Sequence, residues 1–533
     1  MKIFKRKLIF VLLYAALAFG LIYTMTAGGL GISADSESYL VAANRFTQHR
    51  WGESVNPYWP PLYPLNIAAI KAMGLSGLLG AARIVSVFSF IISIVTVYLL
   101  GLQLGGKRTA HLSAISCLVL SSMVYLYCFC WSETLYIMLS LLFLFTLTLF
   151  LKNTGENVTK YLILSGIFSG LGTITRFIGF SLIGAGIVSI IFLSHYHPPA
   201  KKIKKTLVFV GTAVIPVFLY YLICFHYYGL TGKKQFPSSF TFIHQLIQLP
   251  VTVYHDWLTF DLKFWNYVFF FKMGHYFFWL GISVLLFLVW FMILFFRDAF
   301  RLKHSSEFEL KSKTGVFIYV VFYIAFILIV SSTIDIDPIG SRFIVPVYPF
   351  FLLLVFSMVP PVSKISVHGK PKSCFLGMAI LCLAVFWSIQ LLSIISIHQG
   401  INTGSFLAME HPGNLNRGSM EYLKQNLDSN DYILSNVYRK LTFIWPRQEP
   451  YFQTNEETWE ESLNSLVYEA SQRTVYVLIC TGDYTPQGIT VADVDQADNR
   501  IGLFAWKKIF GNDYLYKTKH MAWQPPPESQ EIK

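Results

Sequence analysis

Three acidic residues and two arginines stand where an apolar run of the sequence ends or begins. Asp35 and Glu37 follow the first apolar run, and Glu133 lies in a short turn between two later runs. Arg176 is isolated between two short runs, and Arg342 precedes another. A carboxylate in such a place can take a proton from a hydroxyl group, and a guanidinium can bind phosphate as a planar fork of N–H donors. Together, these residues could serve proton abstraction and phosphate binding.

The composition indicates a membrane protein. The chain has 533 residues, of which 54% are hydrophobic and 13% are charged, and its mean hydropathy is +0.52. Average globular chains carry about 25% charged residues, so an ordinary soluble enzyme, a coiled coil and a disordered chain are excluded. Apolar runs of spanning length recur from residue 8 to residue 397. We therefore predict an α-helical polytopic membrane protein.

The apolar runs predict about eleven transmembrane helices. The predicted spans are residues 8–26, 84–104, 111–130, 134–151, 161–174, 177–193, 206–228, 276–296, 314–332, 343–359 and 374–397. The first run resembles a signal peptide, but we expect a retained helix because no small-residue cleavage site closes it cleanly. The span 161–174 is short for a crossing, so it and 177–193 could instead form a re-entrant hairpin around Arg176.

Basic residues predict which ends of the spans face the cytoplasm. With the N-terminus inside, the inner segments hold 20 of the Lys and Arg residues of the membrane part and the outer segments hold 10, in agreement with the positive-inside rule. An odd number of crossings then places the C-terminal tail outside. Asp35, Glu37 and Glu133 also fall outside, which suits either an outward-facing catalytic cleft or a solvated rim.

The candidate residues also have structural interpretations. Asp35 could cap the helix that we expect after it, and Glu133 could stabilise a helix start through the helix dipole. Arg342 could extend to the membrane interface. Arg176 is different, because a charge at membrane depth is costly unless it is paired. For three of these four residues, the residue types alone leave both interpretations open.

Two further segments contain polar or rigid residues. Three prolines between residues 60 and 64, with aromatic neighbours, predict a rigid, non-helical entry into the bilayer, either a simple interfacial turn or the wall of a lipid-facing groove. The long outer loop 229–275 carries further cations that could bind phosphate, namely Lys233, Lys234 and Lys263. In the same loop, His255 and Asp256 could hold a divalent metal, although interfacial polar residues are the simpler interpretation.

The chain is predicted to form two domains of opposite charge. Residues 1–399 carry a net charge of +18 and residues 400–533 carry −5. The basic excess of the membrane domain suits topology and lipid headgroups rather than nucleic acid. The tail reads as a small extracytoplasmic α/β domain. Its predicted strands are 431–437 and 474–481, and its predicted helices are 418–427 and 457–471.

Several short motifs follow one another along the membrane part. They are an acid after the first helix (Asp35), Pro-Pro-Leu-Tyr-Pro (60–64), Trp-Ser-Glu (131–133), Thr-Arg-Phe-Ile-Gly (175–179) and Arg-Phe-Ile-Val-Pro-Val-Tyr-Pro (342–349), followed by an outer C-terminal domain. This order resembles the GT-C superfamily of membrane glycosyltransferases. It is most similar to the bacterial branch akin to protein O-mannosyltransferases and the lipid A aminoarabinose transferase, over roughly residues 1–399.

The resemblance implies a reaction and roles for individual residues. Such enzymes take a sugar from a polyprenyl-phosphate donor and invert its anomeric centre on the outer face of the plasma (inner) membrane, with a lipid, polysaccharide or protein as acceptor. It implies that Asp35 takes the acceptor proton, that Glu133 orients the acceptor or supports Asp35, and that Arg342 faces the lipid phosphate. Many relatives have two adjacent acids in the first loop, whereas here one residue separates Asp35 from Glu37. The other residues expected to bind substrate are Glu37, Arg176, Lys233, Lys234 and Tyr348.

Two other functions compete with glycosyl transfer. A transporter or flippase of lipid-linked glycans should carry charges in the middle of its spans, whereas the ionisable residues here sit almost wholly at span ends. A non-catalytic scaffold would tolerate changes of the outer acids. No nucleotide-binding motif occurs, which agrees with a lipid-phosphate donor.

Overall fold

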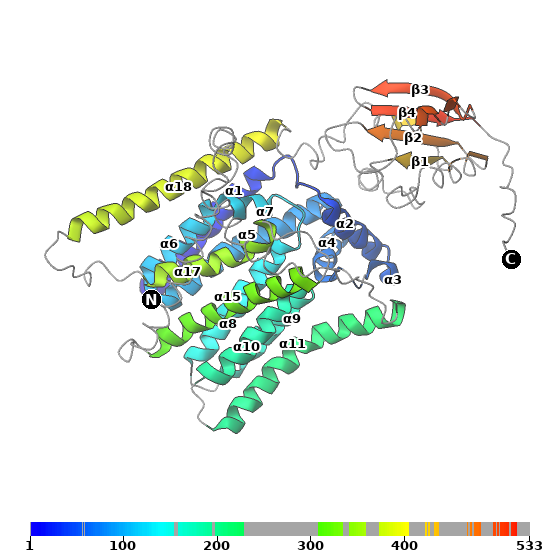
Figure 1. Cartoon of the computed structure of the whole chain (residues 1–533). Coiled ribbons are helices and arrows are strands. Elements are labelled where there is room, and N and C mark those ends of the chain that lie inside the picture. Colours follow the sequence, from blue (N-terminus) through cyan, green and yellow to red (C-terminus); the bar gives the residue numbers. More distant parts are fainter. Residues whose placement is uncertain are drawn as a thin grey trace. The chain divides into compact units, whose positions relative to one another are not determined.

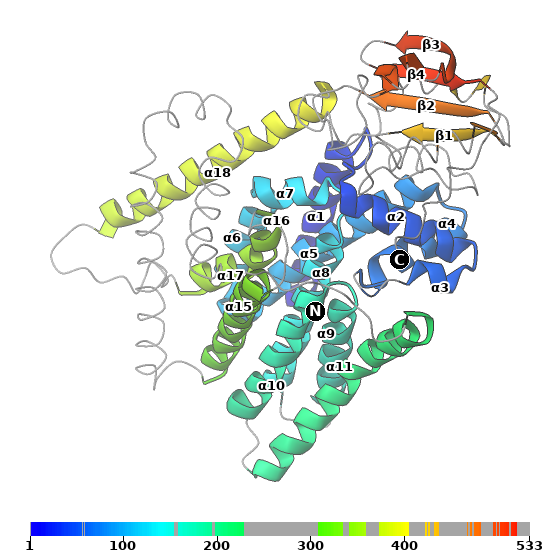
Figure 2. The same ribbon diagram turned by 45° about the vertical axis from the view of Figure 1, so that its right-hand side comes forward.

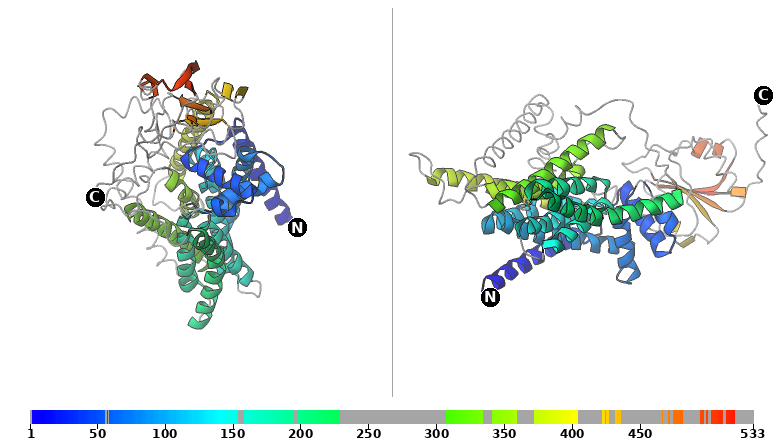
Figure 3. Two further views of the ribbon diagram at one scale, coloured as in Figure 1. Left: turned by 90° about the vertical axis from the view of Figure 1, so that its right-hand side faces the viewer. Right: turned by 90° about the horizontal axis from the view of Figure 1, so that it is seen from below.

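A computed structural model describes most of the membrane part and separate pieces of the tail (Figures 1 and 3). The described residues are 2–55, 57, 59–153, 158–194, 198–228, 307–333, 341–358, 372–403, 422–423, 425–426, 431–435, 466, 470–471, 474–480, 494–496, 498–499, 502–510 and 513–519. The chain divides into two compact units, Met1–Leu30 with Ala42–Asn402 and Gly31–Val41 with Thr403–Lys533.

The first unit is built from helices (Figure 1). In chain order they are α1 (Lys2–Met25), α2 (Ala34–Thr47, which begins in the second unit), α3 (Trp51–Ser54), α4 (Leu62–Ala72), α5 (Leu78–Leu104), α6 (Gly106–Val119), α7 (Ser121–Tyr127), α8 (Glu133–Lys152), α9 (Val158–Thr173), the 3₁₀ turn η1 (Phe177–Gly179), α10 (Phe180–Leu193), α11 (Pro199–Tyr228), α15 (Glu307–Thr333), α16 (Ser341–Ile344), the 3₁₀ turn η3 (Val345–Val347), α17 (Tyr348–Met358) and α18 (Lys372–Thr403).

Helices occur at every predicted span except 276–296, which lies outside the described residues. In the described part, α1, α5, α8, α11 and α15 are long and apolar enough to cross a membrane, and the pair α6–α7 would make a further span with a bend of 60°. Shorter apolar helices lie at 177–193, 342–358 and 383–399. The protein is therefore a mostly helical, multi-pass membrane protein. The full count of eleven crossings stays a prediction.

Burial separates the central helices from the peripheral ones. The apolar window of α8 is 78% buried, whereas that of α1 is 22% buried. Figure 2 shows α8 among α5, α9 and α15, all of which contact it. Many large apolar side chains are exposed along α1 and α11, as expected for surfaces that face lipid tails rather than water. The helix that begins at Glu133 is thus the most buried of the long helices.

The proline-rich segment differs from its prediction. Residues 59–61 are non-helical, but α4 begins at Leu62, so Pro64 lies in its first turn. Proline is compatible with this position because the first N–H groups of a helix have no partner within the helix. The non-helical segment therefore ends at residue 61, three residues earlier than the sequence suggested.

The second unit contains a four-stranded sheet. Its strands are β1 (Tyr432–Ser435), β2 (Val475–Cys480), β3 (Phe504–Phe510) and β4 (Asp513–Thr518), in the order β1-β2-β4-β3. β1 and β2, which the sequence predicted, pair in parallel, and β4 runs antiparallel to both of its neighbours. Val475, Val477 and Leu515 are fully buried in the sheet. A small C-terminal sheet is thus present, as predicted.

Candidate functional site

A buried carboxylate at the start of α8 forms the centre of the candidate site. Glu133 is the first residue of α8 and its side chain is 1% exposed. Ser132 precedes it and donates a weak hydrogen bond of 3.4 Å to its Oε2. A carboxylate in the first turn is favoured by the helix dipole. The predicted position of Glu133 at a helix start is therefore confirmed. Burial to this degree also requires charged partners.

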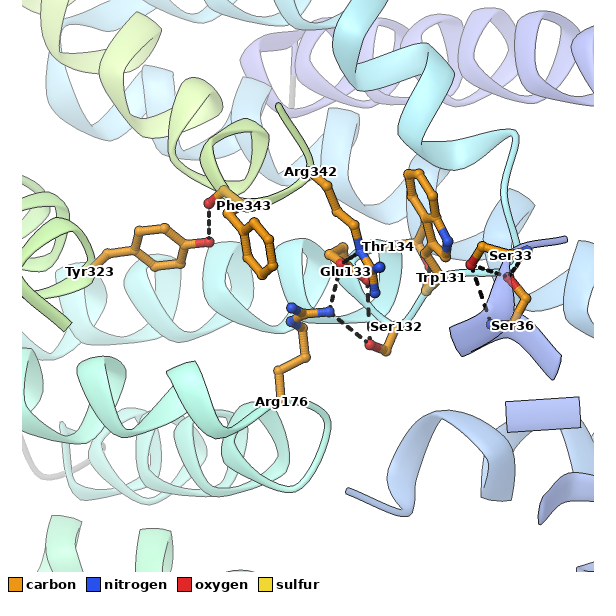
Figure 4. A network of polar contacts seen from close by, with 10 residues as sticks. All are labelled: Ser33, Ser36, Trp131, Ser132, Glu133, Thr134, Arg176, Tyr323, Arg342 and Phe343. Atoms are coloured by element: carbon orange, nitrogen blue, oxygen red, sulfur yellow. Dashed lines mark hydrogen bonds and ion pairs between the residues drawn. The ribbon is translucent and has the colours of Figure 1, made fainter. Parts of the chain in front are cut away.

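Two arginines from distant parts of the chain pair with this carboxylate (Figure 4). Arg176, in the turn between α9 and η1, places Nη1 2.6 Å from Glu133 Oε1 and donates a hydrogen bond of 3.2 Å to Ser132 Oγ. Arg342, in the short helix α16, donates from Nε to the same Oε1. The structure therefore brings together three of the residues that the sequence predicted to act together.

The two arginines share one carboxylate but are themselves partly accessible. Their side chains are 18% and 19% exposed, whereas the carboxylate is closed off. Guanidinium groups match phosphate geometry particularly well. The exposed parts of the two arginines could therefore bind an anion that reaches them.

Aromatic rings hold both arginines in place. The guanidinium carbon of Arg342 lies 4.8 Å from the ring centre of Trp131, and that of Arg176 lies 5.9 Å from the ring of Phe343. Trp131 in turn stacks on Phe129, with 4.3 Å between ring centres and 15° between planes. Cations are attracted to ring faces at such distances. The rings thus restrict the orientation of the arginines without neutralising their charge.

A buried tyrosine on α15 fixes the backbone beside Arg342. The Tyr323 hydroxyl donates a 2.7 Å hydrogen bond to the carbonyl of Phe343 (Figure 4). Tyr319, one turn earlier, lies 3.3 Å from the hydroxyl of Tyr136 on α8. Sequence reasoning missed both α15 tyrosines. Their polar groups inside an apolar span were the available signal, because buried hydroxyls need partners.

The proline-rich segment positions the turn that carries Arg176. The Leu62 N–H, at the start of α4, donates a 3.0 Å hydrogen bond to the carbonyl of Ile174. The Tyr63 hydroxyl donates to Cys130 Sγ at 3.5 Å, in the turn that precedes α8. The prolines just before Leu62 stiffen this connection. Residues 60–64 therefore support both turns of the site.

Glycine at position 179 is required for the same turn. A Cβ atom on Gly179 would lie against the backbone of Thr173 and Gly172, which cannot move as a side chain can. We expect Gly179→Ala to lower the free energy of unfolding by about 1–3 kcal/mol and to displace Arg176. Thermal unfolding and lipid-phosphate binding of the purified protein measure both effects.

The matched control is Gly211→Ala on α11. A Cβ atom there meets nothing within 4 Å, so this change should alter stability by less than about 1 kcal/mol. If the two variants have equal stability and lipid-phosphate binding, the close backbone approach at Gly179 is not important for the site.

The first-loop acids lie in the part of α2 that belongs to the second unit. The expected cap at Asp35 is replaced by Ser33, because α2 begins at Ala34. The Ser33 N–H donates a hydrogen bond of 2.9 Å to Ser36 Oγ, and the Ser36 N–H donates one of 3.4 Å to Ser33 Oγ (Figure 4). This reciprocal pair is a capping box. Asp35 is half-buried in the first turn, and its predicted proximity to Arg342 stays a prediction.

The remaining candidates are less informative. Tyr348 is buried at the start of α17. The side chain of Glu37 is not described, and the loop with Lys233 and Lys234 lies outside the described residues, as does the proposed pair His255–Asp256. Within the described residues, no group of three or more His, Cys, Asp or Glu side chains could hold a metal ion.

Part of the chain matches a known protein family. Residues 59–225 match the family described as dolichyl-phosphate-mannose-protein mannosyltransferase. The segment contains Glu133 and Arg176 but neither Asp35 nor Arg342. No curated protein sequence is significantly similar to the chain.

Solved structures match nearly the whole chain. ArnT from Cupriavidus metallidurans in the apo state has 12% sequence identity and a TM-score of 0.58, with 96% of this chain and 98% of that chain covered. The same protein bound to undecaprenyl phosphate has 14% identity and a TM-score of 0.58, with 95% and 98% covered. The arabinofuranosyltransferase AftD from Mycobacteria has 10% identity and a TM-score of 0.50, with 96% of this chain but 41% of that chain covered.

These matches show the fold of the chain. At such identities the structural matches establish the fold alone, and the family match covers only the segment from the proline-rich motif to α11. The predicted resemblance therefore extends to the fold over nearly the whole chain and to the family model over residues 59–225.

Proposed function

We propose that the protein transfers a sugar from a polyprenyl-phosphate donor to an acceptor hydroxyl on the outer face of the plasma (inner) membrane. The observation that carries the proposal is the cluster of Glu133, Arg176 and Arg342, in which two partly exposed guanidinium groups are held by one buried carboxylate. Two sources outside the site support it. The matched family is named for a lipid-phosphate sugar donor, and ArnT is described with undecaprenyl phosphate bound.

The two arginines would bind the donor phosphate. As the bond between the sugar and the phosphate breaks, negative charge grows on the leaving phosphate. Preorganised cations stabilise such developing charge without reorganising at the moment of reaction. Glu133 would act as a positioning residue that fixes the positions of the two guanidinium groups relative to each other. This role differs from orienting the acceptor, which the family resemblance implied.

Asp35 would act as the general base. The acceptor oxygen attacks the anomeric carbon from the face opposite the phosphate, its proton passes to the Asp35 carboxylate, and the lipid phosphate leaves with the bonding electrons. Attack from the opposite face inverts the anomeric centre. Glu37, Lys233, Lys234 and Tyr348 would complete the substrate contacts. The net charge is conserved, so the step needs no further reactant.

Removal of one arginine tests the phosphate site directly. A hydrogen bond to a charged group contributes about 1.5–3 kcal/mol, so Arg342→Ala should weaken binding of undecaprenyl phosphate roughly 10- to 100-fold. The measurement is a titration of the purified protein in nanodiscs.

Arg83→Ala is the matched control for this titration. Arg83 binds the Tyr23 carbonyl and Thr26 at the end of α1, and its removal also deletes one positive charge. It should leave lipid-phosphate affinity within about 3-fold of the wild type, which is less than 0.7 kcal/mol. If Arg342→Ala binds as tightly as Arg83→Ala, Arg342 does not face the phosphate.

The acceptor is identified by a separate experiment. Mass spectrometry of envelope glycans from a deletion strain shows whether lipid, polysaccharide or protein loses a sugar. An unchanged glycan profile, with intact donor binding, would favour a transport function instead.

A further inference from the structure

A buried glutamine, Gln390, lies on the peripheral helix α18. α18 runs along the side of the bundle (Figures 1 and 2) and exposes Leu381, Leu392 and Ile395. Gln390, on the same helix, is fully buried. A buried polar side chain on an otherwise apolar helix is expected to satisfy a specific partner.

The partner of Gln390 is the bend between α6 and α7. Leu120 has an extended conformation, with φ −70° and ψ 107°, and separates the two helices. Ser121 then starts α7, where the N–H groups have no partner within the helix. Gln390 Oε1 accepts from the Ser121 N–H at 2.9 Å and from Ser121 Oγ at 2.6 Å. Water is scarce at this depth, so α18 supplies a cap that α6 and α7 cannot provide for themselves.

The other end of α7 is tied to the start of α8. The Tyr127 carbonyl, at the end of α7, accepts a hydrogen bond of 2.6 Å from Ser86 Oγ. The Tyr127 hydroxyl lies 3.0 Å from Ser93 Oγ. The same hydroxyl donates a hydrogen bond of 3.2 Å to the carbonyl of Thr134. Thr134 Oγ1 donates back to the carbonyl of Trp131 at 2.8 Å. One short helix thus connects the glutamine cap to the turn that carries Trp131 and Glu133.

We propose that Gln390 is a positioning residue: by capping α7 from α18, it fixes the turn that holds Trp131 and Glu133, and through them the arginine pair. The inference rests on the proposed phosphate-binding role of that pair. It assigns to α18 a part in donor binding through its hydrogen bonds to α6 and α7. Because α7 has only seven residues, few hydrogen bonds hold its start in place. Loss of the cap removes two of them, the hydrogen bonds from Ser121 to Gln390.

A neighbouring contact on α18 provides the matched control. Trp387 lies three residues before Gln390, and its Nε1–H donates 2.9 Å to Ser116 Oγ on α6. Ser116 precedes the bend, so this hydrogen bond attaches α18 to the bundle without touching α7. Trp387→Phe removes it and keeps the ring, and Gln390→Leu removes the cap at similar volume.

The test uses the full-length protein in nanodiscs and two readouts, affinity for undecaprenyl phosphate and hydrogen exchange of residues 121–134. Gln390→Leu should weaken binding at least 10-fold and accelerate exchange in this segment at least 10-fold. Trp387→Phe should stay within 3-fold of the wild type in both readouts. Ser121→Ala, which removes only the hydroxyl donor, is the milder second variant, with an expected loss of about 3-fold in affinity.

The outcomes separate the two proposals. If Gln390→Leu behaves as Trp387→Phe does in both readouts, the positioning role is wrong, because α18 then acts only by docking. If exchange accelerates as expected while Arg342→Ala binds lipid phosphate normally, Gln390 positions the turn but the phosphate role of the cluster is wrong.

Discussion

Glu133→Gln should abolish sugar transfer and also destabilise the protein. The change keeps the size of the side chain but removes the carboxylate that pairs with both Arg176 and Arg342. Breaking a buried ion pair by removing one partner costs about 3–5 kcal/mol. Because both arginines lose their anchor, we expect transfer to fall at least 100-fold, about 2.7 kcal/mol in the barrier. Transfer assays and unfolding of the same preparation measure the two effects.

The chain offers a close control for this prediction. Glu53 is also placed between two arginines, Arg45 and Arg50, but these side chains are between 41% and 48% exposed. Exposed ion pairs contribute about 0–1 kcal/mol, so Glu53→Gln should change stability and transfer little. Similar losses in both variants would mean that burial of Glu133 is not what makes its pairing important.

Asp35→Asn should lower the rate of transfer by roughly 10²–10⁴-fold, the usual contribution of a general base. Asparagine keeps the shape of the side chain but cannot take the acceptor proton. The affinity for undecaprenyl phosphate should stay unchanged, since in this account the donor phosphate is bound by the arginines. Transfer rates and lipid-phosphate titrations on the same variant separate these effects.

The control for Asp35→Asn lies in the C-terminal sheet. Asp495 binds Lys507 and the Tyr516 hydroxyl, so Asp495→Asn changes an acid of the same unit without touching α2. It should leave the transfer rate intact. Full activity of Asp35→Asn would remove this residue as the base, whatever the fate of the arginine cluster.

The spans were predictable because length and hydropathy decide them locally. The bend after Leu120 was not, because the segment around it contains neither proline nor glycine. At this bend Ser121 donates to Gln390, which lies 269 residues further along the chain. A lone glutamine in the run 374–397 was a visible signal, but the partner of a buried amide cannot be read from spacing.

Glu133, Arg176 and Arg342 could be selected from the sequence as candidates, but their pairing could not be predicted. Arg176 could be recognised as needing a partner, because an isolated charge at membrane depth is costly. The contact of Arg342 with Glu133 joins residues 209 positions apart, and only tertiary packing creates it. Capping was one of two interpretations of Asp35, because aspartate is a good capping residue. The structure caps α2 with the Ser33–Ser36 pair instead, through two reciprocal hydrogen bonds.

We propose that the arginine cluster and the Asp35 carboxylate serve one reaction centre. The decisive experiment is a cryo-EM structure of the protein in nanodiscs with undecaprenyl phosphate. We expect phosphate oxygens at hydrogen-bonding distance, about 2.7–3.2 Å, from the guanidinium groups of both Arg342 and Arg176, with the Asp35 carboxylate directed toward the same phosphate. A phosphate bound away from these arginines, or an Asp35 directed elsewhere, would overturn the proposal.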